Sequence, residues 1–257
     1  MPPSVAGVGS VTRTLPPMSG PDIVVFIPAW NEERSLPAVL DELRGELPEA
    51  DVLVVDDGST DDTVVVARRA GAEVLSFPEN RGLGQGIAAG YRYALENEYS
   101  ICGRVDADGQ HPVAELRRLI DEVSAGRCDV AVGSRFVSGD GYPAYRYALR
   151  GARRFGTAVM RRSVGALLHR PFSDPMSGMY AVNVKAMPLL AEPFDSEAPE
   201  VEALLRIGKA GLVLHEIPVE MRQRTEGQSK LKGRKAAAVV VTVAGVLWMG
   251  RRMLRRR

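Results

Sequence analysis

Short apolar runs rich in β-branched residues alternate with segments of helical periodicity along the first half of this chain, and this alternation constrains the fold most. Apolar runs cover residues 23–27, 52–55, 73–77, 100–105 and 130–133. Helical periodicity marks the segments between them, residues 35–46, 60–70 and 83–96, and Pro112 leads a further helix. Strands that alternate with helices predict βαβ units, and strands that are apolar almost throughout predict a parallel sheet buried on both faces.

The pattern changes after about residue 139, where helix-rich stretches surround a segment at residues 178–182 and a late strand at residues 212–221. We expect an α/β fold with one mostly parallel sheet flanked by helices. With 257 residues and 45% apolar content, the chain can build one large core. Ser59 and Asp62 match a capping box at the start of the helix expected at residues 60–70.

We assign residues 21–233 to this domain and predict different behaviour at the two ends. Residues 1–20, rich in Pro, Gly and Ser, are typical of a disordered leader. Residues 234–257 predict a C-terminal helix whose apolar part, residues 236–250, is shorter than the roughly 20 residues of a membrane span. The flanking basic residues and Trp248 favour a helix lying at the membrane surface. The alternative is a helix docked on the protein's own core, in a homo-oligomer or on a small membrane-protein partner.

Composition narrows the functional classes further. The net charge is only +1, the basic residues cluster beside an apolar run, and aromatic residues make up 6%, a pattern that argues against nucleic-acid binding. Two cysteines, Cys102 and Cys128, do not make a disulfide framework and indicate a reducing cytoplasm. We therefore expect a cytoplasmic protein, peripheral on the inner face of the cell membrane.

Polar residues follow each of the five predicted strands. Because ligands of open parallel sheets bind beyond the carboxyl ends of the strands, these residues predict one binding rim. Asp106 and Asp108 follow the fourth strand one residue apart, and carboxylate oxygens suit Mg²⁺ or Mn²⁺ that is shared with substrate phosphates. The other interpretation of this pair is a turn that caps the next helix.

One glycine pattern suggests a different enzyme class. Residues 84–89 fit the dinucleotide fingerprint G-x-G-x-x-A, with Asp106 about 20 residues on, which is the pattern of an NAD-linked oxidoreductase. The fingerprint should follow the first strand of its unit, whereas here it follows the third, so this alternative is remote. The chain also lacks a P-loop and a G-x-S-x-G nucleophile motif.

Seven motifs in order resemble the inverting glycosyltransferases of family 2, which have a GT-A fold, and among them the polyprenyl-phosphate sugar synthases of the dolichyl-phosphate mannose synthase type. The motifs are Ile27-Pro-Ala-Trp-Asn-Glu32, Val54-Val-Asp-Asp-Gly-Ser-Thr60, Asn80-Arg-Gly-Leu-Gly84, Val105-Asp-Ala-Asp-Gly-Gln-His-Pro112, Gly133-Ser-Arg135, Asp174-Pro-Met-Ser-Gly178 and Gly227-Gln-Ser-Lys-Leu231. The resemblance covers residues 22–232. It implies transfer of a hexose from a nucleotide sugar, of the GDP-mannose or UDP-glucose type, to a membrane-borne acceptor.

The resemblance also implies roles for individual residues. Those expected to bind the nucleotide sugar are Pro28, Ala29, Asn31, Glu32, Asp57, Arg81, Gly82, Asp106 and Ala107. The metal, Mg²⁺ or Mn²⁺, would be held by Asp106, Asp108 and Gln110, with Asp108 the most important for catalysis. His111 would pack the loop. A metal at this place would stabilise the charge that grows on the leaving diphosphate.

The acceptor stays open between two kinds of group. A polyprenyl phosphate is already anionic and needs cations, a role that falls to Arg135, Arg222, Arg224 and Lys230, with Ser177 beside the acceptor. A sugar hydroxyl of a lipid-linked glycan or polysaccharide needs a general base, for which Glu200 and Glu202 are the candidates. The same two acids also suit a helix N-terminus on electrostatic grounds alone. A sensor that binds nucleotide sugars without turnover is a further alternative.

Overall fold

A seven-stranded sheet forms the centre of the protein in the computed structural model, which describes residues 23–139, 142, 152–168 and 170–222. Its strands are β1 (Ile23–Ala29), β2 (Asp51–Asp56), β3 (Glu73–Ser76), β4 (Ile101–Arg104), β5 (Val130–Ser134), β6 (Tyr180–Asn183) and β7 (Leu214–Pro218). The strand order is β3-β2-β1-β4-β6-β5-β7, and only β6 runs antiparallel to its neighbours. The predicted mostly parallel sheet is confirmed.

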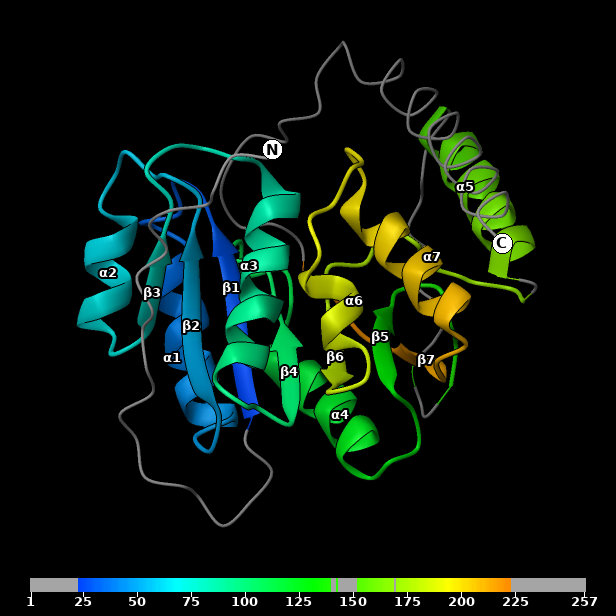
Figure 1. The fold of residues 1–257 in the computed structure, drawn as a ribbon, viewed down its shortest axis with the longest axis horizontal. Helices are drawn as coiled ribbons and strands as arrows, with labels where there is room; N and C mark the ends of the chain where they lie inside the picture. Colours follow the sequence, from blue (N-terminus) through cyan, green and yellow to red (C-terminus); the bar gives the residue numbers. More distant parts are fainter. Residues whose placement is uncertain (1–22, 140–141, 143–151, 169, 223–257) are drawn as a thin grey trace, which may run out of the picture.

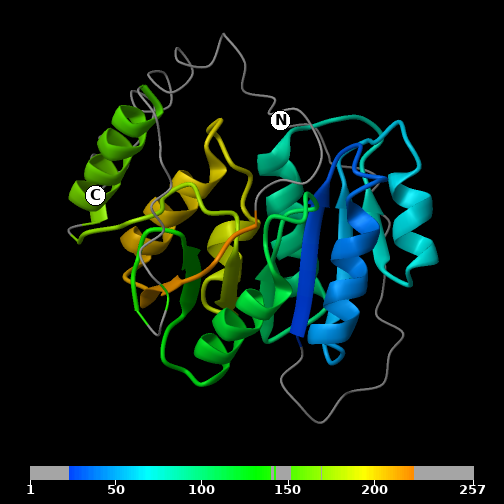
Figure 2. The ribbon, with the colours of Figure 1, turned by 180° about the vertical axis from the view of Figure 1, so that it is seen from behind.

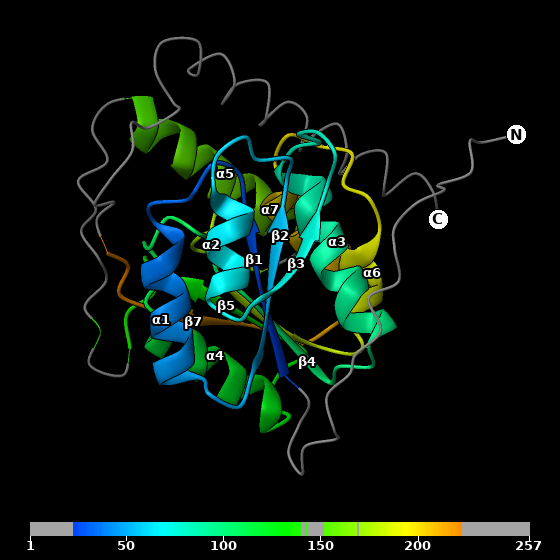
Figure 3. The same cartoon turned by 90° about the vertical axis from the view of Figure 1, so that its left-hand side faces the viewer.

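Helices cover both faces of this sheet (Figure 3). One face carries α1 (Leu36–Glu46), α2 (Thr63–Arg69) and α4 (Val113–Ser124), and α1 and α4 lie in front of the strands in Figure 2. The other face carries α3 (Leu83–Glu96), α6 (Met187–Ala191) and α7 (Pro199–Ala210), and α5 (Ala152–Leu168) packs beside α7 (Figure 1). This is the three-layer arrangement that buried parallel strands require.

The alternation of side chains along the strands divides the core into two parts. In β1, Val24 and Phe26 pack toward α3, while Val25 and Ile27 pack toward α1 and α4. All four are buried, as expected for a central strand with helices on both sides. Gly90 of α3 lies against the ring of Phe26, so the lack of a side chain lets this helix approach the sheet closely.

The structure corrects several predicted boundaries. The β1 strand extends through Pro28 and Ala29, whereas β4 and β7 are shorter than expected. The predicted capping box is wrong, because α2 begins at Thr63 and Ser59 is used elsewhere: its Oγ accepts the N–H of Asn31 at 2.9 Å. The first turn of α2 is instead held by Asp61, whose carboxylate accepts the N–H of Thr63 at 3.0 Å.

The predicted leader (residues 1–20) and the predicted C-terminal helix (residues 234–257) lie outside the described residues. Within the described part of the chain, we find no helix that has both the length and the apolar character to cross a bilayer.

Candidate active site

The residues predicted for the nucleotide sugar and the metal lie at or just beyond the carboxyl ends of β1, β2, β3 and β4, the upper end of the sheet in Figure 1. The strand order reverses here, since β1 has β2 on one side and β4 on the other. Side chains in the loops after these strands can therefore converge on one ligand.

Hydrogen bonds join the loop after β1 to the loop after β2. Asn31, in a left-handed conformation with φ of 56°, donates its N–H to Ser59 Oγ, and its Oδ1 accepts the N–H of Thr60 at 2.8 Å. Glu32 donates its N–H to Thr63 Oγ1 at 2.9 Å. These hydrogen bonds thus fix the loop after β1, which carries Asn31 and Glu32, two residues predicted to bind the nucleotide sugar.

Asp57 organises the loop that precedes α3. Its buried carboxylate accepts the N–H groups of Arg81 and Gly82, at 2.6 Å and 2.9 Å. Gly58 makes this approach possible, because its φ is +69° and a Cβ would lie 2.5 Å from the carbonyl carbon of Glu79. Asp57 therefore holds in place Arg81 and Gly82, two residues predicted to bind the nucleotide sugar.

Asp106 and Asp108 lie in a tight loop after β4. The carboxylate of Asp108 accepts the N–H of Gln110 at 3.0 Å, and Gly109 takes the left-handed conformation with φ of +72°. His111 is buried and its Nδ1 accepts the N–H of Asp106 at 3.1 Å, which confirms the loop-packing role. Burial lowers the pKa of His111, so the neutral ring that this hydrogen bond requires is favoured.

A buried arginine, which sequence analysis missed, lies beneath this loop. Arg104 of β4 donates from Nη2 to Asp106 Oδ1 at 3.2 Å and to Glu200 Oε1 at 3.1 Å. Glu200 stands in the first turn of α7. The signal was a charged residue inside an otherwise apolar strand, but the sequence does not reveal which carboxylate it meets.

Gly178 lies directly against the carboxylate of Asp106. A Cβ at this position would be 2.5 Å from Asp106 Oδ2 and 3.0 Å from His111 Cε1. The position requires glycine for space and not for conformation, since Gly178 is absent from the left-handed glycines. The loop before β6 thus restrains the side chain of the first aspartate.

The predicted acceptor residues of the second half are already engaged with other groups. Arg135 forms a double hydrogen bond with the buried Asp174, at 2.7 Å from Nε and 2.7 Å from Nη2, although 28% of its side chain is exposed. Glu216 in turn accepts the N–H of Asp174 at 3.0 Å, and burial raises the pKa of Glu216. Ser177 is 1% exposed and its Oγ accepts the N–H of Met179, so in this structure the side chain stabilises the turn before β6.

Two further predicted residues have other partners in the structure. Arg222 donates its backbone N–H to the carbonyl oxygen of Gln110 at 2.9 Å, and its guanidinium forms a double ion pair with Glu42 of α1, at 2.6 Å and 3.0 Å. Glu202 is 2% exposed, and its oxygens accept the N–H groups of residues 195 and 196 and a hydrogen bond from Arg206. These contacts favour a structural role for Glu202. Arg224 and Lys230 lie outside the described residues.

A pocket of about 390 Å³ adjoins Arg104 and Glu200, between the N-termini of α3 and α7. Its lining residues are Arg81, Gly82, Leu83, Gly84, Gln85, Met176, Phe194, Asp195, Ser196, Glu197, Pro199 and Glu200. It thus joins the loop held by Asp57 to the carboxylate held by Arg104. Leu83 and Met176 are about half exposed on its wall.

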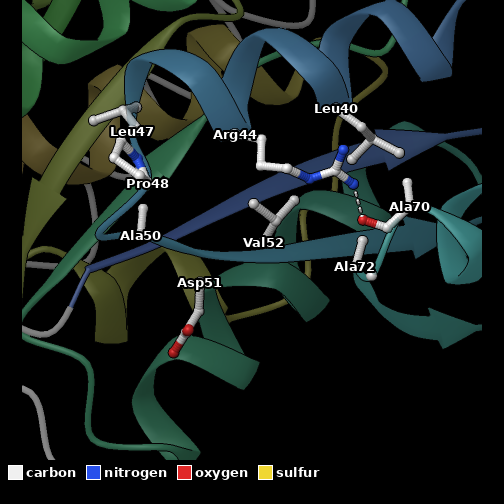
Figure 4. Close-up of a pocket in the computed structure, with 10 residues that line it drawn as sticks. Leu40, Arg44, Leu47, Pro48, Ala50, Asp51, Val52, Ala70 and Ala72 are labelled. Atoms are coloured by element: carbon white, nitrogen blue, oxygen red, sulfur yellow. Dashed lines mark hydrogen bonds between the residues drawn. The ribbon is translucent and has the colours of Figure 1, made fainter.

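A second, smaller pocket lies at the amino end of β2, the opposite end of that strand from the loops described above (Figure 4). It is lined by apolar residues of α1, β2 and the α2–β3 loop, and the guanidinium of Arg44 crosses it to the carbonyl oxygen of Ala70. Asp51, at the start of β2, turns its carboxylate to the hydroxyl of Tyr99 at 2.6 Å. The pocket is therefore remote from the loops after β1, β2 and β4.

Comparison with known proteins agrees with this geometry. The sequence model of the family described as "Glycosyl transferase family 2" matches residues 24–181. The chain belongs to glycosyltransferase family 2. One relative in this family, the undecaprenyl-phosphate mannosyltransferase of Micrococcus luteus, is 33% identical over 232 residues, 86% of this chain and 92% of that protein. Another, the polyprenol monophosphomannose synthase of Mycolicibacterium smegmatis, is 29% identical over 230 residues, 86% of this chain and 85% of that protein.

Solved structures of a glycosyltransferase share the fold. Glucosyl-3-phosphoglycerate synthase from Mycobacterium tuberculosis, in complex with Mn²⁺, UDP and glucosyl-3-phosphoglycerate, aligns with a TM-score of 0.64 at 23% identity. The alignment covers 89% of this chain and 80% of that chain. The fold of this family 2 glycosyltransferase is therefore GT-A-like, as predicted, and the NAD-linked oxidoreductase is excluded as its class.

The donor set at the rim fits a metal shared with substrate. Among the described residues, no group of three His, Cys, Asp or Glu side chains could hold a metal ion. Asp106 and Asp108 supply carboxylate oxygens one residue apart, which suits a hard cation that takes its remaining ligands from phosphates and water. The residues thus fit Mg²⁺ or Mn²⁺ bound together with a nucleoside diphosphate.

Proposed function

We propose that this glycosyltransferase moves a hexose from a nucleotide sugar to the phosphate group of a membrane-borne polyprenyl phosphate. The donor side of the proposal rests on the loops that follow β1, β2 and β4. Asn31 and Asp57 hold the backbone around the nucleoside pocket, and Asp106 and Asp108 supply oxygen ligands for Mg²⁺ or Mn²⁺. The names of the two relatives support a hexose and a polyprenyl-phosphate acceptor.

The reaction requires little from the side chains beyond position and charge. The acceptor oxygen attacks the anomeric carbon while the nucleoside diphosphate leaves from the opposite face, so the product has inverted configuration. A divalent cation on Asp106 and Asp108 would offset the negative charge that grows on the diphosphate. Arg81, exposed on the loop that Asp57 fixes, adds a cation on the nucleotide side.

One observation favours a phosphate over a hydroxyl as the attacking group. Glu200, the remaining candidate for a general base, is bound to the buried guanidinium of Arg104. Its Oε1 is thus occupied by a hydrogen bond from a buried cation, whereas a phosphate oxygen can attack without any general base. Arg135, which is partly exposed beside Asp174, is our candidate for the cation that binds this phosphate.

A hydrolysis and transfer screen tests this function. Purified protein is incubated with GDP-mannose, UDP-glucose and related nucleotide sugars in the presence of Mn²⁺, with and without a short polyprenyl phosphate. We expect acceptor-stimulated release of one nucleoside diphosphate. Stimulation by a polyprenyl-linked sugar but not by the polyprenyl phosphate would show that the acceptor is a hydroxyl, and absence of turnover with every donor would indicate the sensor.

Substitution of Asp108 tests the proposed metal site most directly. We expect Asp108→Ala to abolish Mn²⁺-dependent turnover, because the cation loses a ligand, and to change stability by only about 0.5 kcal/mol, as for other partly exposed positions. Asp121→Ala, an exposed aspartate near the end of α4, is the matched control and should behave like the wild type. Full activity of the Asp108 variant would refute the proposed metal site.

We also infer attachment to the inner membrane surface through the basic and apolar residues 234–257. Nine Lys and Arg and no acid occur between residues 230 and 257, which favours anionic lipid. Deletion of residues 234–257 should release the protein from vesicles that contain anionic lipid in a sedimentation assay. Equal sedimentation of both proteins would contradict the inference, and vesicles of neutral lipid provide the control.

A further inference from the structure

The buried arginine of β4 is the most unusual charged residue in the described part of the chain. The side chain of Arg104 is 3% exposed, and its strand neighbours Ile101, Cys102 and Gly103 are apolar. The alternation of β4 puts Arg104 on the same face as Cys102, toward α3 and α7. Removing a guanidinium from water is costly, so such a residue needs compensating charges close by.

Two carboxylates provide that compensation, and both belong to the candidate active site. A single atom, Arg104 Nη2, lies 3.2 Å from Asp106 Oδ1 and 3.1 Å from Glu200 Oε1. Asp106 stands on the metal-side loop, while Glu200 stands in the first turn of α7 on the wall of the larger pocket. One guanidinium nitrogen thus joins the two sides of the site, which are far apart in the sequence.

The surroundings of the guanidinium are otherwise poor in hydrogen-bond partners. Tyr91 of α3 and Tyr180 of β6 are buried close enough to interact electrostatically with Arg104 and Glu200. Neither Arg104 Nε nor the hydroxyl of Tyr180 has a hydrogen-bond partner among the described residues. The guanidinium therefore does not use all of its hydrogen-bond donors, and its contacts with the two carboxylates fix its position.

We propose that Arg104 is a positioning residue that fixes the separation between Asp106 on the metal side and Glu200 on the pocket side of the site. The proposal rests on the proposed transfer function, because only a reaction that spans both sides makes their separation matter. A cation between the two carboxylates also allows Glu200 to approach the metal-side loop without the repulsion that two neighbouring carboxylates would feel. Loss of Arg104 should let Asp106 and Glu200 move apart.

The test compares Arg104→Met, which fills the space without charge, with Arg104→Lys, which keeps one charge. Arg206→Met is the matched control, because Arg206 also binds a buried glutamate of α7, at 2.6 Å from Glu202, and donates its other hydrogen bonds to the backbone oxygens of residues 189, 192 and 193. For each protein we measure kcat and KM for the donor, the melting temperature, and the affinity for Mn²⁺ with UDP and, in parallel, with GDP.

We expect Arg104→Met to reduce kcat at least tenfold while the affinity for the Mn²⁺ and nucleotide pair changes less than threefold. This split is the mark of a group that acts in the transition state rather than in binding. Arg104→Lys should restore part of kcat. In the control, Arg206→Met, the melting temperature should fall by a similar amount, but kcat should fall much less.

A double-mutant cycle with Glu200→Gln tests whether Arg104 acts through Glu200. The doubly substituted protein should have the kcat of the slower single variant, since both changes break the same link. Three results would each overturn the proposal. They are a kcat of the double variant that is reduced by the product of the two single reductions, an unchanged kcat in Arg104→Met, and a parallel loss of kcat and nucleotide affinity. If the wild type shows no transfer at all, the proposed function fails, and the cycle in melting temperature and Mn²⁺–nucleotide affinity still reports whether Arg104 couples Glu200 to Asp106.

Discussion

A single methyl group added at residue 178 should slow the reaction of this enzyme while the protein stays folded. In Gly178→Ala the new Cβ would start 2.5 Å from Asp106 Oδ2 and 3.0 Å from Oδ1. Carbon and oxygen atoms in contact normally keep about 3.3–3.6 Å apart, so the carboxylate must move by roughly 1 Å. Rotation away is restricted, because Arg104 holds Oδ1 and the ring of His111 lies 3.0 Å from the same Cβ.

The expected loss follows from this displacement. A misplacement of about 1 Å in a group that positions the reactants costs about 10²-fold in rate, or roughly 2.7 kcal/mol of transition-state free energy. Overpacking of one methyl group should cost only about 1–3 kcal/mol of folding stability. The residue's φ is not left-handed, so we expect no backbone strain in addition.

The assay measures kcat/KM for the donor as a function of Mn²⁺ concentration, with thermal unfolding in parallel. Gly45→Ala is the control, because nothing lies within 4 Å of a Cβ at this exposed position of α1. It should leave activity unchanged and stabilise the helix by up to about 1 kcal/mol. Wild-type activity in a well-folded Gly178→Ala protein would refute the claim that the placement of the Asp106 carboxylate matters for the reaction.

Three further predictions follow from other contacts. Asp57→Asn removes one of two carboxylate oxygens that hold the loop before α3, and should cost about 1–3 kcal/mol in chemical unfolding and weaken nucleotide binding in calorimetry. The pKa of Asp129 is lowered, mainly by the hydrogen bond from Asn183. Its contribution to stability is therefore present above its unfolded pKa of about 3.8 and is lost as the pH falls through the lower folded value. In urea unfolding between pH 3 and 6, the free energy of unfolding of Asp129→Asn should decrease less toward acid pH than that of the wild type. Burial raises the pKa of Cys128 to about 11 and also raises the pKa of Cys102, so a thiol reagent at pH 8 should label neither until the protein unfolds.

The strand ends show how far local sequence reasoning reaches. The apolar run of β1 and the paired aspartates after β4 could be recognised because their signals are short-range: a buried parallel strand is apolar throughout, and a metal-binding loop carries acids close together. The same reasoning placed the start of α2 three residues too early. Ser59 looked like a helix cap, but its hydroxyl binds the backbone of Asn31, which is 28 residues away in the chain.

The sequence by itself determined the class of this protein: alternating apolar runs specify a sheet covered by helices, and the motifs after the strands specify a family 2 glycosyltransferase. Only the tertiary structure decided which partners the polar residues of the second half meet. Glu200 meets Arg104 across 96 residues, whereas Glu202, two positions along the same helix, turns to Arg206 and the backbone of residues 195 and 196. Successive positions on a helix face different partners, and those partners are brought close only by the packing of α7 beside the sheet. Periodicity and motif spacing report short-range geometry, whereas the pairing of buried charges depends on the packing of elements that are distant in the sequence.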